Sequence, residues 1–527
     1  MMHTFNLLKK PWLPCIDPKN RVKMLNLVDA ITEAQHLKAI QAELPITTGA
    51  LYVFLIAFVK AAINPNNDDA WEAIWQRGAF PYEAITRYGE QWEDRFDLFD
   101  RDHPFYQDPK LGTRPKDIQN LVKGKSLEPK GISGLLLHLA SGNNATLFDH
   151  SVDDLPKSYS PAETARLLIM LQSNSLGGMS SASISKDKYY KDSPFGRGIL
   201  FLNRGVNLFQ TVLLNLIPKD FDPLDSVMND QPVWELEDPF ESEKLTPTGM
   251  LDFLTWQSRR ILLIPENIKG EVVVQNCYTA PGLGLVETFN NPLYHIRYVK
   301  RGSQQKTPPL RFQEGRSLWR DSAAILDVKS ENSVPALPIQ WYARLKAQDI
   351  VKEETVQLDL YGMCTEPGQK KAYFYAQESF SAPAYFLEDR SALEALHAGL
   401  NQAEQVRSDL YLATRELARF KVAPFHDKPD GKSADTKAVE ALMQHINAEQ
   451  FYWSKLEPAF YTYIMSLPKS DQAHDIWQQS LRVAARGALA YASDLVGTDP
   501  PGLKARAKAE ESLARLLYKT FNTQTYI

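Results

Sequence analysis

The pattern of apolar residues changes near residue 380, and this change is the feature of the sequence that most restricts the fold. After Pro383, apolar residues recur at helical spacing over long stretches, and breaks rich in Pro, Gly or Asp separate them. Helices of this length with short connections pack as an antiparallel bundle. We therefore expect a C-terminal four-helix bundle over 381–527, with helices at Ser391–Phe420, Ala434–Leu467, Ser470–Leu495 and Gly502–Phe521.

The first 380 residues show a mixed pattern. Thr47–Ile63 repeats apolar residues at helical spacing, which predicts a buried helix. Ile261–Ile264 and Val272–Val274 are typical of short strands on either side of the tight turn 267–270. Because 527 residues are too many for one core, we expect at least two domains. The predicted fold class is α+β, with a mixed domain of helices and short strands over 1–380, followed by the bundle.

Charge and cysteine content restrict the class of protein. A net charge of −5 argues against a protein that binds nucleic acid alone, because such proteins usually carry a basic excess. The same charge is a weaker argument against one subunit of a larger ribonucleoprotein. Cys15, Cys277 and Cys364 lie far apart, which argues against a disulfide framework and fits a reducing cytoplasm. The longest apolar run, Ala50–Val59, is too short to span a bilayer. We expect a cytoplasmic protein without a membrane partner.

A Gly/Ser/Asn-rich segment, Ser173–Ser181, separates two apolar helical runs, Ala162–Leu171 and Leu208–Leu216. Small residues let the backbone turn sharply and approach another molecule closely. Loops that rigid elements hold in place are where binding sites tend to lie. The pattern therefore predicts a binding loop at this position, and a pair of ordinary surface turns is the alternative interpretation.

Motifs of catalysis are mostly absent. The chain has no HExxH and no GxSxG, and Gly124-Lys125-Ser126 fails as a phosphate loop because position 119 is Gln. A loop His beside an Asp, as in Asp149-His150, can act as a base, but no nucleophile accompanies it. We expect no enzyme activity, no metal and no other cofactor. Two alternatives stay open: a metal-dependent nuclease or hydrolase that uses Asp149, His150 and acids from 94–108, and a structural adaptor without direct DNA contact.

Several short motifs come in a fixed order along the chain, and together they carry a family resemblance. They are Asn6-Leu7-Leu8 with Pro11-Trp12-Leu13-Pro14, Arg95-Phe96-Asp97-Leu98-Phe99, His103-Pro104-Phe105-Tyr106-Gln107, the run 141–150 (SGNNATLFDH), and Asn207-Leu208-Phe209-Gln210-Thr211 with Leu213-Leu214-Asn215. This ordered set resembles the large subunit of the type I-E CRISPR surveillance complex, the CasA family of Cascade. The resemblance covers essentially the whole chain.

The resemblance implies a non-catalytic subunit of an RNA-guided antiviral complex. Such a subunit recognises the protospacer-adjacent motif in double-stranded DNA, helps open the duplex for crRNA pairing and recruits the helicase-nuclease. The implied partners are double-stranded DNA, the crRNA-containing complex of the other Cascade subunits, and the helicase-nuclease effector.

The resemblance also gives roles to residues. A glycine-containing loop reads the motif, a lysine finger reaches the minor groove and a glutamine wedge opens the duplex; only two consecutive glycines stand in the loop here, which leaves the preferred motif open. The loop 143–150 reaches both the motif region and the crRNA, and basic residues of the bundle guide the displaced strand. The motif-reading residues are Leu176, Gly177, Gly178 and Met179, with Asn143, Asn144 and the finger Lys269; the wedge is Gln369, the crRNA-contact loop has Phe148, Asp149 and His150, and the displaced-strand residues are Lys504, Arg506 and Lys508.

Overall fold

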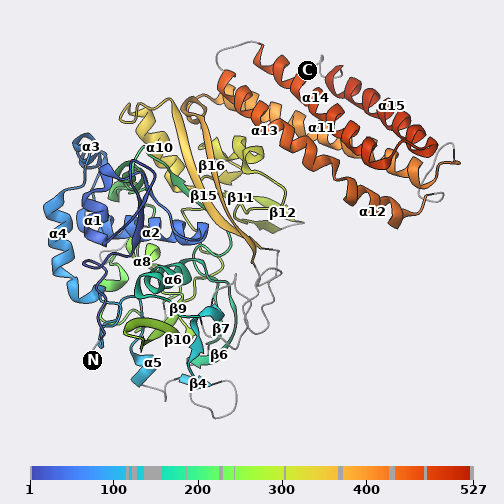
Figure 1. Cartoon of the computed structure of the whole chain (residues 1–527). Coiled ribbons are helices and arrows are strands. Elements are labelled where there is room, and N and C mark those ends of the chain that lie inside the picture. Colours follow the sequence, from blue (N-terminus) through green and yellow to red (C-terminus); the bar gives the residue numbers. More distant parts are fainter. Residues whose placement is uncertain are drawn as a thin grey trace. The chain divides into compact units, whose positions relative to one another are not determined.

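The computed structural model divides the chain into two compact units. The first is Met1–Ser317 with Val328–Ser381, and the second is Leu318–Asp327 with Ala382–Ile527, so the chain passes between them three times. The predicted α+β class is confirmed, because helices and short strands alternate in the first part and the C-terminal part is helical (Figure 1). The structure describes residues 3–113, 118–120, 127–135, 157–184, 187–224, 230–241, 244–301, 304–365, 372–426, 434–467 and 472–522.

Helix α2 (Pro45–Ile63) is the core element of the first unit (Figure 1). Its residues from Ile46 to Lys60 are all buried, which its almost wholly apolar sequence requires. Lys60 interrupts the apolar run, and its ammonium pairs with the buried carboxylate of Asp222 at 3.1 Å and donates to the carbonyl of Ile217 at 2.9 Å. Among the described residues, α2 alone is long and apolar enough to cross a membrane, and 83% of that apolar window is buried inside the protein.

Shorter helices surround α2 in the first unit. Each has at least one buried apolar residue, such as Leu111 of the single-turn α5, and Trp71 of α3 is fully buried. They are α1 (Leu27–Thr32), α3 (Asp68–Arg77), α4 (Tyr82–Gln91), α5 (Lys110–Thr113), α6 (Pro161–Asn174), α7 (Leu208–Leu214), α8 (Met250–Leu254) and α10 (Leu337–Ala347).

The strands of the first unit form small antiparallel sheets. Their orders are β2-β1-β3, β5-β10-β9, β4-β6-β7, β16-β15-β8, β11-β14 and β12-β13. The strands are β1 (Leu13–Ile16), β2 (Val22–Leu25), β3 (Ala39–Ile40), β4 (Ile118–Asn120), β5 (Lys130–Gly131), β6 (Gly178–Ile184), β7 (Asp187–Tyr190), β8 (Ile199–Asn203), β9 (Arg259–Ile268), β10 (Glu271–Pro281), β11 (Ile296–Arg297), β12 (Val299–Arg301), β13 (Gln304–Lys306), β14 (Ser333–Val334), β15 (Thr355–Thr365) and β16 (Ala372–Pro383).

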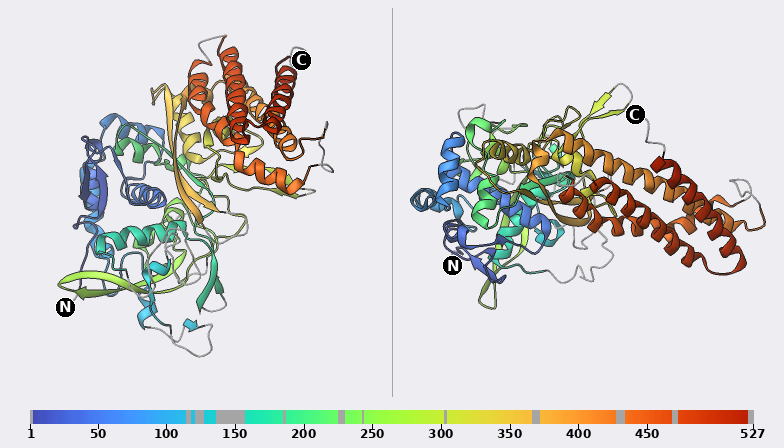
Figure 2. Two further views of the ribbon diagram at one scale, coloured as in Figure 1. Left: turned by 45° about the vertical axis from the view of Figure 1, so that its right-hand side comes forward. Right: turned by 90° about the horizontal axis from the view of Figure 1, so that it is seen from above.

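The hairpin of β9 and β10 is a long ribbon in the first unit (Figure 2). Its turn has two residues, Lys269 (φ 54°) and Gly270 (φ 91°), and Ile268 pairs with Glu271. Two consecutive residues at positive φ match the twist of an antiparallel ribbon. The predicted tight turn is therefore confirmed, with strands longer than the sequence pattern indicated.

The second unit is helical, and α11, α14 and α15 run side by side (Figures 1 and 2). The prediction of one continuous helix over 434–467 is wrong. Asn447 adopts a left-handed conformation (φ 43°) that ends one helix and begins the next, so the described part of this unit after Ala382 has five α-helices where four were expected. They are α11 (Arg390–Val422), α12 (Thr436–Ile446), α13 (Ala448–Ser466), α14 (Ala473–Val496) and α15 (Pro500–Asn522).

A short insertion from the middle of the chain belongs to the second unit. Leu318–Asp327 contributes helix α9 (Ser322–Leu326) and the buried Trp319, whose ring stacks on Phe460 at a centroid distance of 4.5 Å. The guanidinium of Arg320 lies over the Trp453 ring at 3.6 Å and pairs with Glu404 at 2.6 Å. A single boundary near residue 380 therefore does not account for this segment.

Candidate nucleic-acid interface

The predicted motif-reading residues follow α6 directly. Leu176 is 7% exposed, so its side chain belongs to the core and not to a loop surface. Gly178 begins β6, and Met179 on that strand is 75% exposed. The expectation of a continuous loop is corrected, because the segment is a loop only as far as Gly177 and continues as β6, which pairs antiparallel with β7.

The two glycines have different surroundings. A Cβ on Gly177 would lie 2.8 Å from the carbonyl oxygen of Tyr190, and the Gly177 N–H donates to Asp192 Oδ1 at 2.6 Å. A Cβ on Gly178 would have no atom within 4 Å. Neither residue has a positive φ. The fold therefore needs glycine at 177, because two backbone segments approach closely there, and does not need glycine at 178.

Arg259 lies beneath this segment and binds its backbone. The guanidinium is 6% exposed and donates to the carbonyls of Leu176 (2.9 Å), Lys191 (2.8 Å) and Ser258 (2.8 Å). It also lies over the Tyr190 ring at 4.7 Å from the centroid. Burial lowers the pKa of Arg259 to about 10, and this value still keeps the guanidinium protonated near neutral pH. One cation thus joins the end of α6, the end of β7 and the start of β9.

A buried polar network stiffens the same junction. The Ser258 hydroxyl donates to the carbonyl of Gln172 at 2.8 Å and lies 2.6 Å from the Ser193 hydroxyl. The Gln172 side chain accepts from the Arg259 N–H and donates to the Arg259 carbonyl. Buried networks whose members are paired hold a single geometry. The exposed ribbon therefore starts from a rigid support.

Two residues that the sequence analysis missed lie beside the glycines. Gly178 pairs with Tyr190 and Met179 with Tyr189, which is 51% exposed. Lys191 follows β7 directly and is exposed, and the stem of its side chain lies against Gly284, where an added Cβ would come within 2.5 Å of Lys191 Cγ. No partner of the Lys191 ammonium is found among the described residues. Only the strand register brings these residues next to Gly178, so sequence spacing carried no signal for them.

Lys269 is exposed at the hairpin turn, as expected, but the structure does not bring it next to the glycines. Arg259, which binds Leu176, begins β9, and Lys269 follows the other end of this ten-residue strand. A strand rises about 3.3 Å per residue, so about 30 Å separates the two ends. Lys269 and the backbone segment that Arg259 binds therefore lie at opposite ends of β9.

Several predicted site residues lie outside the described part of the chain. They are Asn143, Asn144, Phe148, Asp149, His150 and the wedge Gln369. Strand β15 ends at Thr365, before the Gln369 segment, and β16 begins at Ala372, after it.

The predicted displaced-strand residues all lie on α15, and each already has a partner in the second unit. Lys504 donates to the carbonyl of Pro424 at 2.8 Å, Arg506 pairs with Glu510 at 2.8 Å, and Lys508 pairs with Glu511 at 2.9 Å. A carboxylate beside a cation reduces the field that a DNA phosphate would meet. The positive potential of this helix is therefore weaker than its sequence indicated.

Two acids of 94–108, the segment that the enzyme alternative would use, have clear structural partners. Asp97 accepts from the N–H groups of Phe5 and Phe99, and Asp108 pairs with Arg260 at 2.9 Å. Among the described residues, no group of three or more His, Cys, Asp or Glu is arranged to hold a metal ion. Asp97 and Asp108 therefore serve a turn and an ion pair.

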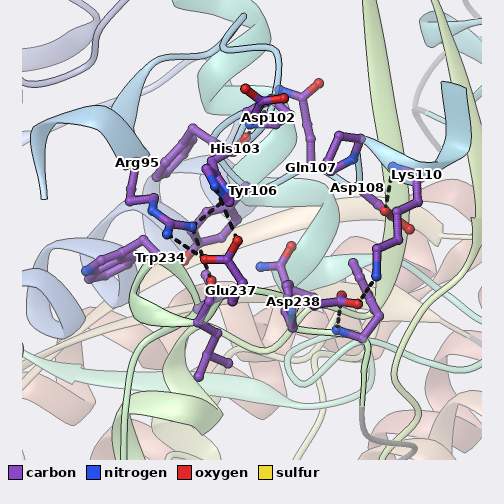
Figure 3. Close-up of a pocket in the computed structure, with 18 residues that line it drawn as sticks. Arg95, Asp102, His103, Tyr106, Gln107, Asp108, Lys110, Trp234, Glu237 and Asp238 are labelled. Carbon is purple, nitrogen blue, oxygen red and sulfur yellow. Dashed lines mark hydrogen bonds and ion pairs between the residues drawn. The ribbon is translucent and has the colours of Figure 1, made fainter. Parts of the chain in front are cut away.

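A small cavity lies beside these acids, between 95–110 and 233–240 (Figure 3). Its volume of about 60 Å³ has room for only a few water molecules. Across it, Glu237 pairs with Arg95 at 2.9 Å and lies 3.5 Å from His103, while Asp238 pairs with Lys110 (Figure 3). The charged residues that line the cavity therefore form ion pairs that anchor residues 233–240.

Comparison with known proteins assigns the class. Residues 6–488 match the family model for the CRISPR-associated protein Cse1. The CRISPR-associated protein CasA/Cse1 of Thermus thermophilus is 30% identical over 528 residues, which cover 98% of each chain. The crystal structure of a CasA from Thermus thermophilus has a TM-score of 0.78 and 25% identity, over 98% of this chain and all of that one.

A further solved structure, that of a CRISPR RNA-guided surveillance complex, contains a chain with the same fold. This chain has a TM-score of 0.72 at 18% identity, over 97% of the present chain and 99% of its own length. The molecule is thus a CRISPR-associated protein by class. The chain belongs to the Cse1 family, also named CasA, and the predicted family resemblance is confirmed.

Proposed function

We propose that this chain is the large subunit of an RNA-guided surveillance complex, and that it recognises a short motif in double-stranded DNA before the guide RNA pairs. Its membership of the Cse1 family supports the assignment to such a complex, and a related fold occurs in a structure of an RNA-guided surveillance complex. The chain itself then acts by binding and carries out no chemistry.

The observation that carries the DNA-binding part of the proposal is Gly178. Nothing in the fold requires glycine there, since a Cβ would meet open space and φ is not positive. A glycine at the start of a strand does permit another molecule to approach the backbone. The neighbouring Met179 is 75% exposed, and Met is one of the apolar residues that minor-groove proteins insert between base steps.

Other parts complete the proposed path of the duplex. Lys269 follows the far end of β9, and the two ends of this strand lie about 30 Å apart, close to the length of one turn of B-DNA. In this proposal Lys269 contacts a phosphate about one turn away from the motif. Gln369 acts as the wedge, and residues 143–150 contact the motif region and the crRNA. The cations of α15 contribute weakly to the displaced strand, and the complex recruits the helicase-nuclease after the duplex opens.

Reconstitution of the guide-loaded complex with and without this chain tests the proposal. The probes are a duplex library randomised next to the guide-matched target, and the same target with a fixed scrambled flank. We expect motif-selective binding only when the chain is present, with an affinity that falls steeply as salt rises, because phosphate contacts release counterions. Equal binding of all flanks would contradict motif recognition, and salt-independent binding would favour the adaptor. DNA cleavage by the isolated chain with a divalent metal would favour the nuclease.

A further inference from the structure

We propose that Lys191 is the cation that contacts DNA beside Gly178, and that Arg259 is the positioning residue that holds it there. This inference rests on the proposed function and names residues that its motif-reading site requires.

The first argument is the exposed face of the ribbon. Met179 and Tyr189 form a cross-strand pair, and both are more than half exposed. Lys191 directly follows β7, which ends at Tyr190, and its carbonyl is held by Arg259. This part of the ribbon thus has an exposed Met and an exposed Tyr paired across two strands, and an exposed lysine directly after the second strand. Proteins that bind the minor groove use this combination, an apolar side chain at a base step with a cation for acceptors or phosphate.

The second argument is the availability of the lysine. Most cations described near this junction are engaged: Arg197 pairs with Asp192 at 2.8 Å, and the guanidinium of Arg259 is buried against three carbonyls. Lys191 is exposed, and its carbonyl is the group that is bound. Gly284 leaves room for its side-chain stem. The ammonium group is therefore free to meet a ligand while its backbone stays fixed.

The third argument is the geometry of Arg259. Its two terminal nitrogens donate to carbonyls on opposite sides of the glycines, that of Leu176 before β6 and that of Lys191 after β7. A planar guanidinium fixes two acceptors in one arrangement, which a lysine ammonium does not do. Arg259 therefore sets the separation between Gly178 and Lys191, although it touches no DNA itself.

The test uses the assembled guide-loaded complex and duplexes with the selected or the scrambled motif. For Lys191→Gln we expect a loss of at least about fivefold in affinity for the selected duplex, the lower end of the range for a good contact, with unchanged melting temperature and unchanged assembly. Lys219→Gln is the matched control, because Lys219 is an exposed lysine of the same unit in another element, the 3-10 turn Lys219–Phe221. Equal affinities of the Lys191→Gln and Lys219→Gln variants for the selected duplex would contradict the proposed role of Lys191. Loss of assembly of the Lys191→Gln variant with the guide complex would also contradict it.

Arg259→Met and Arg260→Met separate positioning from stability. Arg260 follows Arg259 on β9, and its ion pair with Asp108 also contributes to stability, but it does not contact the glycine segment. Both variants are expected to melt at lower temperature. Only Arg259→Met should reduce the ratio of selected to scrambled binding, by about tenfold per folded molecule, as much as one mismatched base pair. A preserved ratio in Arg259→Met would show that Arg259 is merely structural.

Gly178→Asp distinguishes this inference from the proposed function. If it abolishes motif selection while Lys191→Gln and Arg259→Met leave selection intact, the further inference fails and the proposed function stands. If Gly178→Asp also leaves selection intact, the proposed function fails, and the inference fails with it.

Discussion

At the scale of single residues, the adjacent positions 177 and 178 are both glycine, but for different reasons. Gly177 is constrained by the fold, because its Cα faces the Tyr190 carbonyl at a distance that admits no Cβ. The fold does not constrain Gly178, and we propose a DNA contact as the reason for glycine at this position. The sequence pattern predicted a binding loop at both positions, but only the ribbon geometry separates them.

Alanine substitutions test this difference. Gly177→Ala should destabilise the protein by about 1–3 kcal/mol, the usual cost of forcing an atom into a packed site. Gly178→Ala should leave stability unchanged or raise it by up to about 1 kcal/mol, because it removes freedom from the unfolded chain. Urea denaturation measures both, and motif binding by the assembled complex is measured on the same preparations. Equal destabilisation by the two substitutions would contradict the assignment.

Lys269 has an unusual backbone conformation for a lysine. Its φ of 54° is the left-handed region, where a residue other than Gly, Asn or Asp carries a penalty of about 1–2 kcal/mol. Lys269→Asn should therefore preserve or slightly improve stability, since Asn tolerates this conformation. Because the proposed contact is to phosphate, we expect the variant to weaken selected and scrambled duplexes by the same factor. Gel-shift titrations of both duplexes check this, and a loss confined to the selected duplex would mean that Lys269 reads bases.

At the scale of elements, α2 combines an apolar core helix with one buried ion pair. The periodicity predicted the helix, and the structure adds that Lys60 and Asp222 compensate each other, at 3% and 1% side-chain exposure. The partner of Lys60 comes from a distant segment of the chain, so no local pattern could have predicted it.

Breaking this pair should be costly. Lys60→Met removes the ammonium that pairs with the buried Asp222 carboxylate, and removing one partner of a buried pair typically costs about 3–5 kcal/mol. Adding Asp222→Asn to Lys60→Met should recover part of the loss, because a neutral amide is less costly to bury than a charge. Thermal denaturation of the two single variants and the double variant measures the coupling. Strictly additive losses would show that the two charges do not interact.

At the scale of the whole molecule, the second unit is assembled from two parts of the chain. The change in the pattern of apolar residues near residue 380 located the main part of the second unit. Nothing in the sequence indicated that Leu318–Asp327 belongs to the same unit. Trp319 is a buried aromatic that packs on Phe460 and Trp453 of α13. We propose that residues 382–527 need this insertion in order to fold to full stability.

Expression of 382–527 alone tests this proposal. Without the insertion, the rings of Trp453 and Phe460 lose their partner, and loss of a buried Trp typically costs about 3–5 kcal/mol. We expect a lower melting temperature than for the same fragment with 318–327 joined through a flexible linker. The matched control joins the same segment carrying Trp319→Ala and Arg320→Ala, which should not restore stability. Identical melting of all three fragments would show that the insertion contributes nothing to the fold.

The sequence by itself determined the α+β class, the core helix α2, the turn at Lys269-Gly270, the helical C-terminal part and the family. These features depend on periodicity, turn chemistry and motif order, which are local properties of the chain. Only the tertiary structure decided that Leu176 is buried, that Gly177 and Gly178 differ, that Lys269 lies far from both, and that Arg259 and Lys191 adjoin the ribbon. The physical reason is that each of these facts depends on which carbonyl or ring meets a residue across space. Pairings between distant segments follow from strand register and packing, and spacing along the chain does not record them.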